Sequence, residues 1–176
     1  MFSINDTVLY GANGVCRITD ICQKEFSGVI KDYYILTPLS NETMTIFVPV
    51  NNKLLTNRIK RILSKGEICD LITTASSKPI NWIIDDNERK EHYRTILSSG
   101  NRLEILNMIR ELYIHKQEQL KNGKKMHLSD EQLMKEAERL LYSEFSLVLN
   151  IRADEVPKFI SSRTVSYTHL TLPTKA

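Results

Sequence analysis

The chain of 176 residues lacks the patterns that mark common catalytic and metal sites. It has three cysteines, Cys16, Cys22 and Cys69, with no CxxC spacing and no histidine at ligand spacing. It also has no glycine-rich phosphate loop, no HExxH sequence and no nucleophile elbow. We therefore expect no enzyme, no metal and no cofactor, and thiols that are reduced and partly buried.

Long apolar runs and a signal peptide are also missing. No run approaches the ~20 apolar residues that a membrane span needs. Residues 1–6 lack the basic start and apolar stretch of a secretion signal. Hydrophobic residues make up 41% of the chain and charged residues 26%, which is typical of a soluble globular protein. These features predict a cytoplasmic protein without a membrane partner, long enough for one ordinary core or two small ones.

The first fifty residues are rich in β-branched and aromatic side chains, and they predict a small antiparallel β-barrel. Four short strands are expected, at residues 7–10, 15–21, 33–37 and 44–48. A turn is expected at residues 11–14, which include residues that tolerate a positive φ, and a second turn is expected in a polar stretch centred on Ser27-Gly28. The predicted fold class is α+β, with a Tudor/SH3-like barrel at residues 1–56 followed by an all-helical bundle.

Alternation along the last predicted strand separates two sets of side chains: Met44, Ile46 and Val48, and Thr45, Phe47 and Pro49. If the first set fills the core, Phe47 points outward close to a strand end at Pro49. An exposed edge with an aromatic side chain favours pairing with a partner strand. The alternative is that Phe47 packs beneath the segment that follows.

The second half changes to helical periodicity from Asp85 onward. Residues 57–80 are expected to connect the two domains: residues 57–73 form a short connector that can contain helical turns, and residues 73–78 have the small, polar composition of a linker. Residues 81–163 are expected to form a helical domain. Four helices are predicted. The first covers residues 85–98, and the second begins at Asn101, which forms a capping pair with Glu104. The third begins at Ser129, which forms a capping pair with Gln132, and ends at about residue 150, and the fourth lies near residues 154–160. Glu144 is a polar interruption in the apolar stripe of the third of these helices. Three histidines on or near the helices are expected to be solvated: His92, His115 and His127.

The last residues, 164–176, have neither helical nor strand periodicity. They look like translated sequencing-adapter DNA, so we expect a non-native tail. Tyr167 and His169 are therefore given no functional role.

Trp82 is the only tryptophan and lies at the joint between the two halves. Pro79 disfavours helix at residue 78, so a linker is expected there. A large amphipathic ring followed by the cations Arg89, Lys90 and Arg94 indicates an apolar wedge beside a phosphate-binding surface. The alternative is that Trp82 anchors one domain against the other. The net charge of +3 permits nucleic-acid binding but does not establish it.

Stretches in both halves resemble the CarD/CdnL-type bacterial transcription regulators. In the first half they are residues 2–10 with Gly14-Val15, residues 31–36 and residues 45–49. In the second half they are Asn81-Trp82, Ser99-Gly100-Asn101 and the helix from Leu106 to Tyr113. The resemblance covers about residues 1–160. The first domain of that family is shared with the RNA-polymerase-interacting domain of transcription-repair coupling factor.

The resemblance implies that the barrel binds the β subunit of RNA polymerase and that the helical domain faces promoter DNA. It implies that Trp82 is inserted at the upstream edge of the melted region and slows collapse of the bubble, while nearby cations meet phosphates. We expect a monomer that binds promoter DNA only weakly and non-specifically when alone. The alternative is a polymerase adaptor with the same two domains and no direct DNA contact.

Departures from the family pattern affect the expected site residues. Phe47 stands where some members have an arginine, and Lys24 aligns with another basic contact position. The expected polymerase-binding residues are therefore Lys24, Thr45 and Phe47. After Trp82, an arginine-rich continuation is replaced by Ile83-Ile84-Asp85-Asp86. The expected DNA-binding residues are Trp82, Arg89, Lys90, Arg94, Lys124 and Lys125, although the last two are equally consistent with a solvated loop.

Overall fold

The computed structural model describes residues 1–168, and it describes side chains up to residue 164. The boundary between two compact units falls between Ile62 and Leu63. The expected boundary at residue 56 is six residues too early, because residues 59–61 form a strand that belongs to the first unit.

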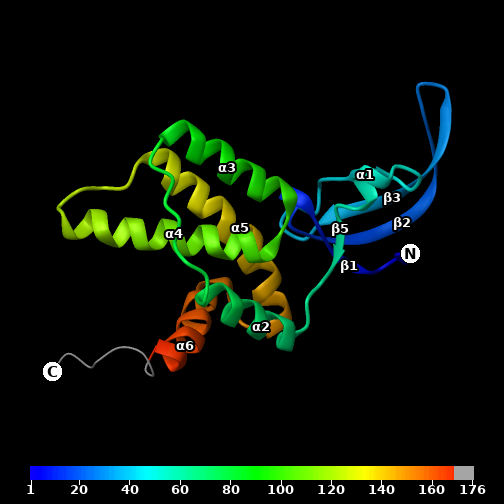
Figure 1. Cartoon of the computed structure of the whole chain (residues 1–176). Helices are drawn as coiled ribbons and strands as arrows, with labels where there is room; N and C mark the ends of the chain where they lie inside the picture. Colours follow the sequence, from blue (N-terminus) through cyan, green and yellow to red (C-terminus); the bar gives the residue numbers. More distant parts are fainter. Residues whose placement is uncertain (169–176) are drawn as a thin grey trace. The chain divides into compact units, whose positions relative to one another are not determined.

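The first unit is one antiparallel sheet of five strands in the order β4-β3-β2-β1-β5 (Figure 1). The strands are β1 (Thr7–Tyr10), β2 (Val15–Phe26), β3 (Val29–Pro38), β4 (Ile46–Pro49) and β5 (Ile59–Arg61). A 3-10 turn η1 (Gly11–Asn13) joins β1 to β2, and a short helix α1 (Lys53–Thr56) follows β4. This open, barrel-like sheet followed by helices confirms the predicted α+β class. Four of the five strands were predicted, and β5 is too short to show a period.

The long hairpin of β2 and β3 is closed by Ser27 and Gly28. Phe26 pairs with Val29 across this two-residue turn, and the φ angles of Ser27 and Gly28 are 54° and 77°. Positive φ at both positions gives a turn whose twist matches that of the flanking strands. The predicted turn is confirmed, and Figure 1 shows the hairpin as a long curved ribbon.

The core of the first unit lies on one face of this sheet. It is formed by the buried residues Val8, Tyr10, Cys16, Ile18, Tyr34, Leu36, Val48 and Ile59. Burial raises the pKa of the Cys16 thiol to about 11, so the thiol stays protonated. All three cysteines are free, in agreement with the prediction of reduced thiols.

The second unit is helical, as predicted. Its elements are α2 (Lys65–Ser76), α3 (Asp86–Ser99), α4 (Arg102–Lys121), α5 (Leu128–Leu149), η2 (Ala153–Glu155) and α6 (Val156–Thr168). Their apolar faces form one core, to which α4 and α5 contribute most: Ile105, Leu106, Met108, Ile109 and Leu112, with Met134, Ala137, Leu140, Leu141 and Phe145. Among residues 1–168, no helix is both long and apolar enough to cross a bilayer.

Helix α2 occupies much of the segment that was expected to be a connector and linker. Ser64 begins it through a capping box, in which its Oγ accepts from the Glu67 N–H at 3.2 Å and the Glu67 carboxylate accepts from the Ser64 N–H at 2.8 Å. In its polar last turn the hydroxyls of Thr73 and Thr74 donate to carbonyls four residues earlier, so these polar side chains are satisfied within the helix. The linker predicted at residues 73–78 was therefore wrong for residues 73–76, whereas helical turns within the connector at residues 57–73 were one of the expectations.

The other helix ends follow local rules with one exception. Gly100, with φ of 64°, ends α3, and the Asn101 side chain caps α4 by accepting from the N–H groups of Leu103 and Glu104. Helix α5 begins at Leu128 without a side-chain cap, so the predicted Ser129–Gln132 pair was wrong. Helix α6 extends into the segment predicted as a tail. Residues 169–176, including His169, lie outside the described residues.

Glu144 is the predicted polar interruption on α5, and it is fully buried. Arg102 donates to its two carboxylate oxygens at 2.7 and 2.8 Å. The Leu63 N–H donates to the same carboxylate at 3.0 Å. This charge is therefore compensated, and it ties the first residue of the second unit to α4 and α5.

Candidate functional site

The segment between α2 and α3 carries Trp82, and we call its residues 78–85 the strap. Side chains of α4 hold its first half. Arg110 donates to the carbonyl of Lys78, and it also donates at 3.0 Å to the carbonyl of Ala75 in α2. Glu111 accepts from the Asn81 N–H at 3.3 Å, while its other oxygen accepts from a buried tyrosine hydroxyl, that of Tyr93, at 3.0 Å.

The second half of the strap is held by Arg89 of α3. Its Nη1 donates to the carbonyls of Ile83 at 2.9 Å and Ile84 at 3.3 Å. Its Nε and Nη2 donate to the Asp130 carboxylate at 3.1 and 2.7 Å, and Nη2 also donates to Asp86 at 2.7 Å. All five N–H groups of the guanidinium therefore have acceptors inside the helical unit.

This network corrects the expectation that Arg89 contacts DNA phosphate. Its side chain is only 2% exposed, and Asp130 is 0% exposed. Burial disfavours the charge on Arg89, but its hydrogen bonds to Asp130 and Asp86 outweigh that effect and raise its pKa. The residue is a buried tie between α3, α5 and the strap.

Trp82 is half-buried, and its ring packs inside the helical unit. The indole stacks on the imidazole of His115 with centroids 3.8 Å apart and an interplanar angle of 13°. The guanidinium carbon of Arg89 lies 4.5 Å from the centre of the same ring. These contacts fix the orientation of the indole and leave part of it accessible.

The expectation that His115 is a solvated surface histidine was wrong, because the strap covers it. Burial lowers the pKa of His115, and the positive charges of Arg89 and His127 act in the same direction. The carboxylates of Asp130 and Glu118 oppose this shift but do not cancel it. His115 therefore stacks on the indole as a neutral imidazole at neutral pH.

Ile84 is a candidate residue that the sequence reasoning missed. Its side chain is 88% exposed although its carbonyl is fixed by Arg89. The next residue, Asp85, caps α3 by accepting from the Glu88 N–H at 2.8 Å. The signal in the sequence is the apolar pair Ile83-Ile84 between Trp82 and a helix cap. The strap thus displays an apolar side chain on a backbone that is held on both sides.

Two of the predicted DNA-binding cations lie on α3, the helix that directly follows the strap. Lys90 is half-buried and Arg94 is exposed, both on α3. The hydrogen bond from Arg89 lowers the pKa of Asp86, and the nearby charges of His127 and Lys90 add to that shift. Lys124 and Lys125 are exposed on the α4–α5 loop, which in Figure 1 runs from the end of α4 to the start of α5.

The predicted polymerase-binding residues all lie on the surface of the first unit. Lys24 is exposed on β2, and Phe47, on the edge strand β4, is 40% exposed. Thr45 is exposed in the loop before β4 rather than in the strand. Met44 is 42% exposed, so its predicted core position was wrong. A turn in which Asn41 accepts from Met44 N–H and Thr43 keeps these residues out of the sheet.

Phe47 points outward, as one of the two expectations had it, but it is not isolated. Its ring packs edge-on against Phe26 at 5.3 Å and Tyr33 at 6.3 Å between centroids. Phe26 and Tyr33 are themselves 5.3 Å apart. Phe47 therefore packs on the β2–β3 hairpin and not under the segment that follows it.

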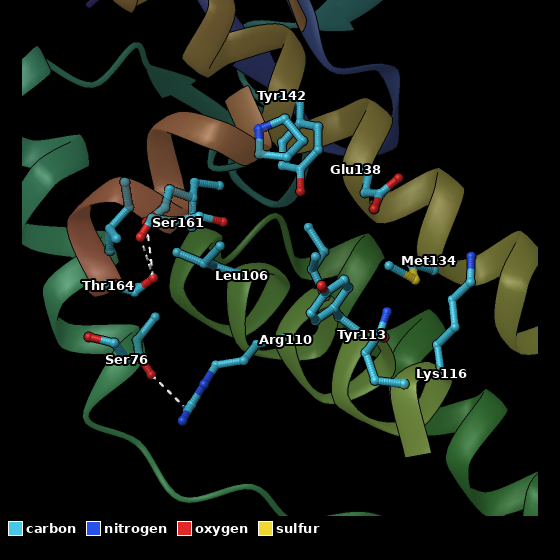
Figure 2. A pocket seen from close by; sticks show the side chains of 16 residues that line it. Ser76, Leu106, Arg110, Tyr113, Lys116, Met134, Glu138, Tyr142, Ser161 and Thr164 are labelled. Carbon is cyan, nitrogen blue, oxygen red and sulfur yellow. Dashed lines mark hydrogen bonds between the residues drawn. The ribbon is translucent and has the colours of Figure 1, made fainter. Parts of the chain in front are cut away.

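A groove of about 530 Å³ opens between α2, α4, α5 and α6 (Figure 2). Its walls are largely apolar, with Leu106 and Met134 among them, and Glu138 and Tyr142 are among its polar residues. Burial raises the pKa of Glu138. None of the predicted site residues lines this groove. Among the described residues, no cluster of three or more His, Cys, Asp or Glu could hold a metal ion.

Comparison with known families agrees with the division into two units. Residues 2–63 match the CarD-like/TRCF RID domain, and residues 67–161 match the CarD C-terminal domain. The chain belongs to the CarD family. Because the chain carries both of these CarD-family domains, it is a transcription regulator that interacts with RNA polymerase.

A relative of the chain is the Bacillus subtilis (strain 168) protein named "Putative transcription factor YdeB". The two are 22% identical over 159 residues, which cover 90% of this chain and 99% of the relative. The matched residues therefore extend over both units of this chain.

Proposed function

We propose that this CarD-family chain is a non-catalytic regulator that binds the β subunit of RNA polymerase and stabilises the open promoter complex. In this proposal the first unit contacts polymerase near the edge strand β4. The strap of the second unit lies at the upstream edge of the melted DNA. The observation that carries the proposal is the strap itself, which holds Trp82 and Ile84 rigidly at the surface beside basic residues of α3.

The physical basis is competition with base restacking. A bubble closes when unpaired bases stack again on the neighbouring duplex. An apolar side chain that occupies the space of a stacked base opposes this step, as inserted apolar wedges do in other DNA complexes. Because the strap is fixed before binding, little conformational entropy is lost when Trp82 and Ile84 meet DNA.

Cations around the strap supply the sequence-independent part of the contact. Lys90 and Arg94 are the proposed phosphate ligands, with Lys124 and Lys125 on the neighbouring loop. Arg89 acts indirectly, because its guanidinium fixes the backbone of Ile83 and Ile84 and lies against the indole. It is therefore a positioning residue in this proposal.

A second candidate is a polymerase adaptor whose helical unit makes no direct DNA contact. The stacking of Trp82 on His115 favours it, because a half-buried ring with internal partners can be purely structural. The strongly exposed Ile84 separates the two candidates, because its side chain has little structural role to play.

The test is the lifetime of open promoter complexes after competitor challenge, measured with purified polymerase and each variant. We expect Trp82→Ala to remove most of the added lifetime while polymerase binding stays intact. Loss of its stacking and cation–π contacts should lower stability by about 1–3 kcal/mol, which leaves a cooperative thermal transition. Full stabilisation by this variant, or a broadly unfolded variant, would support the adaptor.

Ile84→Ser provides the matched variant. We expect an unchanged melting temperature, because the side chain is 88% exposed, together with a shorter open-complex lifetime. Leu147→Ser on α5, a second exposed apolar position of the helical unit, is the control and should leave the open-complex lifetime unchanged. An Ile84→Ser variant as active as the parent would remove this residue from the wedge.

A further inference from the structure

The groove between α2, α4, α5 and α6 is lined by none of the strap residues and by none of the predicted binding residues. Its volume of about 530 Å³ falls within the ~300–1,000 Å³ of typical small-molecule sites. Such sites combine apolar walls with a few polar groups that fix the orientation of the ligand. All four helices supply apolar residues to this groove, among them Ile72, Leu106, Ile109, Met134 and Ile160. The groove therefore has the size and the lining of a ligand site.

Both cations that line the groove already have partners within the helical unit. Arg110 donates to the carbonyls of Ala75 and Lys78 at the C-terminal end of α2, where the helix dipole also favours a positive charge. Lys116 pairs with Glu131 of α5 at 4.0 Å. An anionic ligand would therefore compete with contacts that the protein makes by itself.

Glu138, the acidic residue among the lining residues, has no such partner. Among the residues that the structure describes, no cation lies within 4.0 Å of its carboxylate. Burial raises the pKa of Glu138, and the charges of Lys116 and Lys135 oppose this shift without cancelling it. The negative charge of Glu138 is therefore incompletely compensated, and a positive charge placed beside it would be stabilised.

Tyr142 lies four residues after Glu138, so both side chains extend from the same face of α5 toward the groove (Figure 2). Within the described part of the chain, its hydroxyl has no hydrogen-bond partner. Burial and the nearby charge of Glu138 raise the pKa of Tyr142, so the hydroxyl stays protonated and its oxygen can still accept a hydrogen bond. The apolar groove thus contains a neighbouring carboxylate and phenol oxygen that are both available as acceptors.

We propose that the groove binds a small primary amine with an apolar body, whose ammonium group lies between Glu138 and Tyr142. An ammonium group has three N–H donors, and the carboxylate and the phenol oxygen accept two of them. Tyr113 adds an aromatic ring to the same groove, and the faces of such rings attract ammonium groups. The apolar body packs on the buried side chains of Leu106 and Ile109, and its removal from water supplies most of the affinity.

This binding mode predicts an order of affinity among ligands that share one alkyl chain. Octylammonium buries the chain and compensates the charge of Glu138. Octanol buries the same chain but leaves that charge uncompensated. Octanoate places a second negative charge beside the first, which is unfavourable in a partly buried site. Octylammonium should therefore bind most tightly and octanoate least tightly.

The experiment is a calorimetric titration of the full-length protein with each of these three ligands at neutral pH. Glu138→Gln keeps the shape of the side chain and removes its charge. Glu136→Gln is the matched control, because Glu136 lies on the same helix outside the groove and pairs with Arg139. We expect Glu138→Gln to weaken octylammonium binding at least tenfold, Tyr142→Phe to weaken it severalfold, and Glu136→Gln to change it less than twofold. If a variant fails to melt cooperatively, the order of the three ligands on the parent chain still tests the proposal.

The methyl resonances of two methionines show where the ligand binds. Met134 lines the groove, whereas Met44 lies in the first unit. Saturation with octylammonium should shift the methyl resonance of Met134 and leave that of Met44 in place.

Several results would overturn the proposal. Tighter binding of octanoate than of octylammonium would make the groove a site for anions. Equal binding of all three ligands, or equal binding of octylammonium by the parent and Glu138→Gln, would mean that apolar contact alone holds them. No binding of octylammonium, or a shift at Met44 without one at Met134, would show that the groove takes no amine. None of these measurements involves polymerase or DNA, so the proposed function is tested separately.

Discussion

At the scale of single residues, Arg89 shows how burial changes the role of a charge. Its position in the sequence after Trp82 resembles that of a DNA-binding cation. In the structure, however, its guanidinium is paired with the carboxylates of Asp130 and Asp86. Bringing the guanidinium and the Asp130 carboxylate out of water is costly, and their pairing offsets that cost only while both partners are present. Removing one of them should therefore be far more damaging than removing a cation on the surface.

We expect Arg89→Met to lower the free energy of unfolding by about 3–5 kcal/mol, because Asp130 is left buried without its counter-charge. Lys90→Glu should change stability by less than about 0.5 kcal/mol and instead shorten the open-complex lifetime. Urea denaturation of both variants makes the comparison. The double variant Arg89→Met with Asp130→Leu should recover much of the lost stability. An Arg89→Met protein as stable as the parent would show that the buried pair contributes little.

At the scale of elements, the strap is a loop that behaves as part of the bundle. Side chains from α3 and α4 bind its backbone at Lys78, Asn81, Ile83 and Ile84. The neutral ring of His115 supports its indole. A positive charge on His115 would face Arg89, His127 and the low polarity of a covered site.

The protonation of His115 should therefore weaken the strap as the pH falls. Because burial lowers the folded-state pKa of His115 below the ~6.5 of an unfolded chain, the unfolded chain takes up the proton first. The stabilising contribution of the neutral His115 ring should be complete above about pH 6.5. It should be lost as the pH falls from there through the folded-state pKa of His115. The measurement is the difference in unfolding free energy between the parent and His115→Gln. It should be larger at pH 7.5 than at pH 5.5, and the reverse order would mean that the folded-state pKa is raised.

At the scale of the whole molecule, the chain combines two units with different partners in one proposed function. The net charge is only +3, and the burial of Arg89 removes one of the few cations near the strap. Strong binding to duplex DNA by the free protein is therefore not expected. Attachment to polymerase would raise the local concentration of the helical unit at the promoter, so that two weak contacts act together.

We expect the free protein to bind duplex DNA no more tightly than the ~10⁻⁴–10⁻⁶ M of non-specific contacts at physiological salt. Reversing the charges of Lys90 and Arg94 together should reduce open-complex lifetime and its salt sensitivity, because fewer counterions are released. Polymerase binding should be unaffected. Fluorescence anisotropy with labelled duplex, beside the competitor-challenge assay, measures both quantities. Tight, sequence-specific binding by the free protein would instead identify an operator-binding repressor.

Local backbone features were determined by the sequence alone. Ser27-Gly28 specified a hairpin turn, Gly100 ended α3 and the Asn101 side chain capped α4. Each depends on the φ preference of one residue or on hydrogen bonds within three residues along the chain. The order of motifs from residue 2 to Tyr113 likewise indicated the CarD family before the fold was known. The capping box at Ser64 was equally readable, but the polar last turn of α2 concealed its helix.

Only the tertiary structure decided which side chains meet. The partner of Arg89 lies 41 residues away in sequence, His115 reaches Trp82 from α4, and β5 is a strand only because β1 pairs with it. The contacts of Phe47 with Phe26 and Tyr33 likewise required the register of β2, β3 and β4. A local conformation is set by neighbouring residues, whereas burial and pairing depend on how distant segments pack. The same arginine can therefore be a surface cation in the sequence and a buried tie in the folded chain.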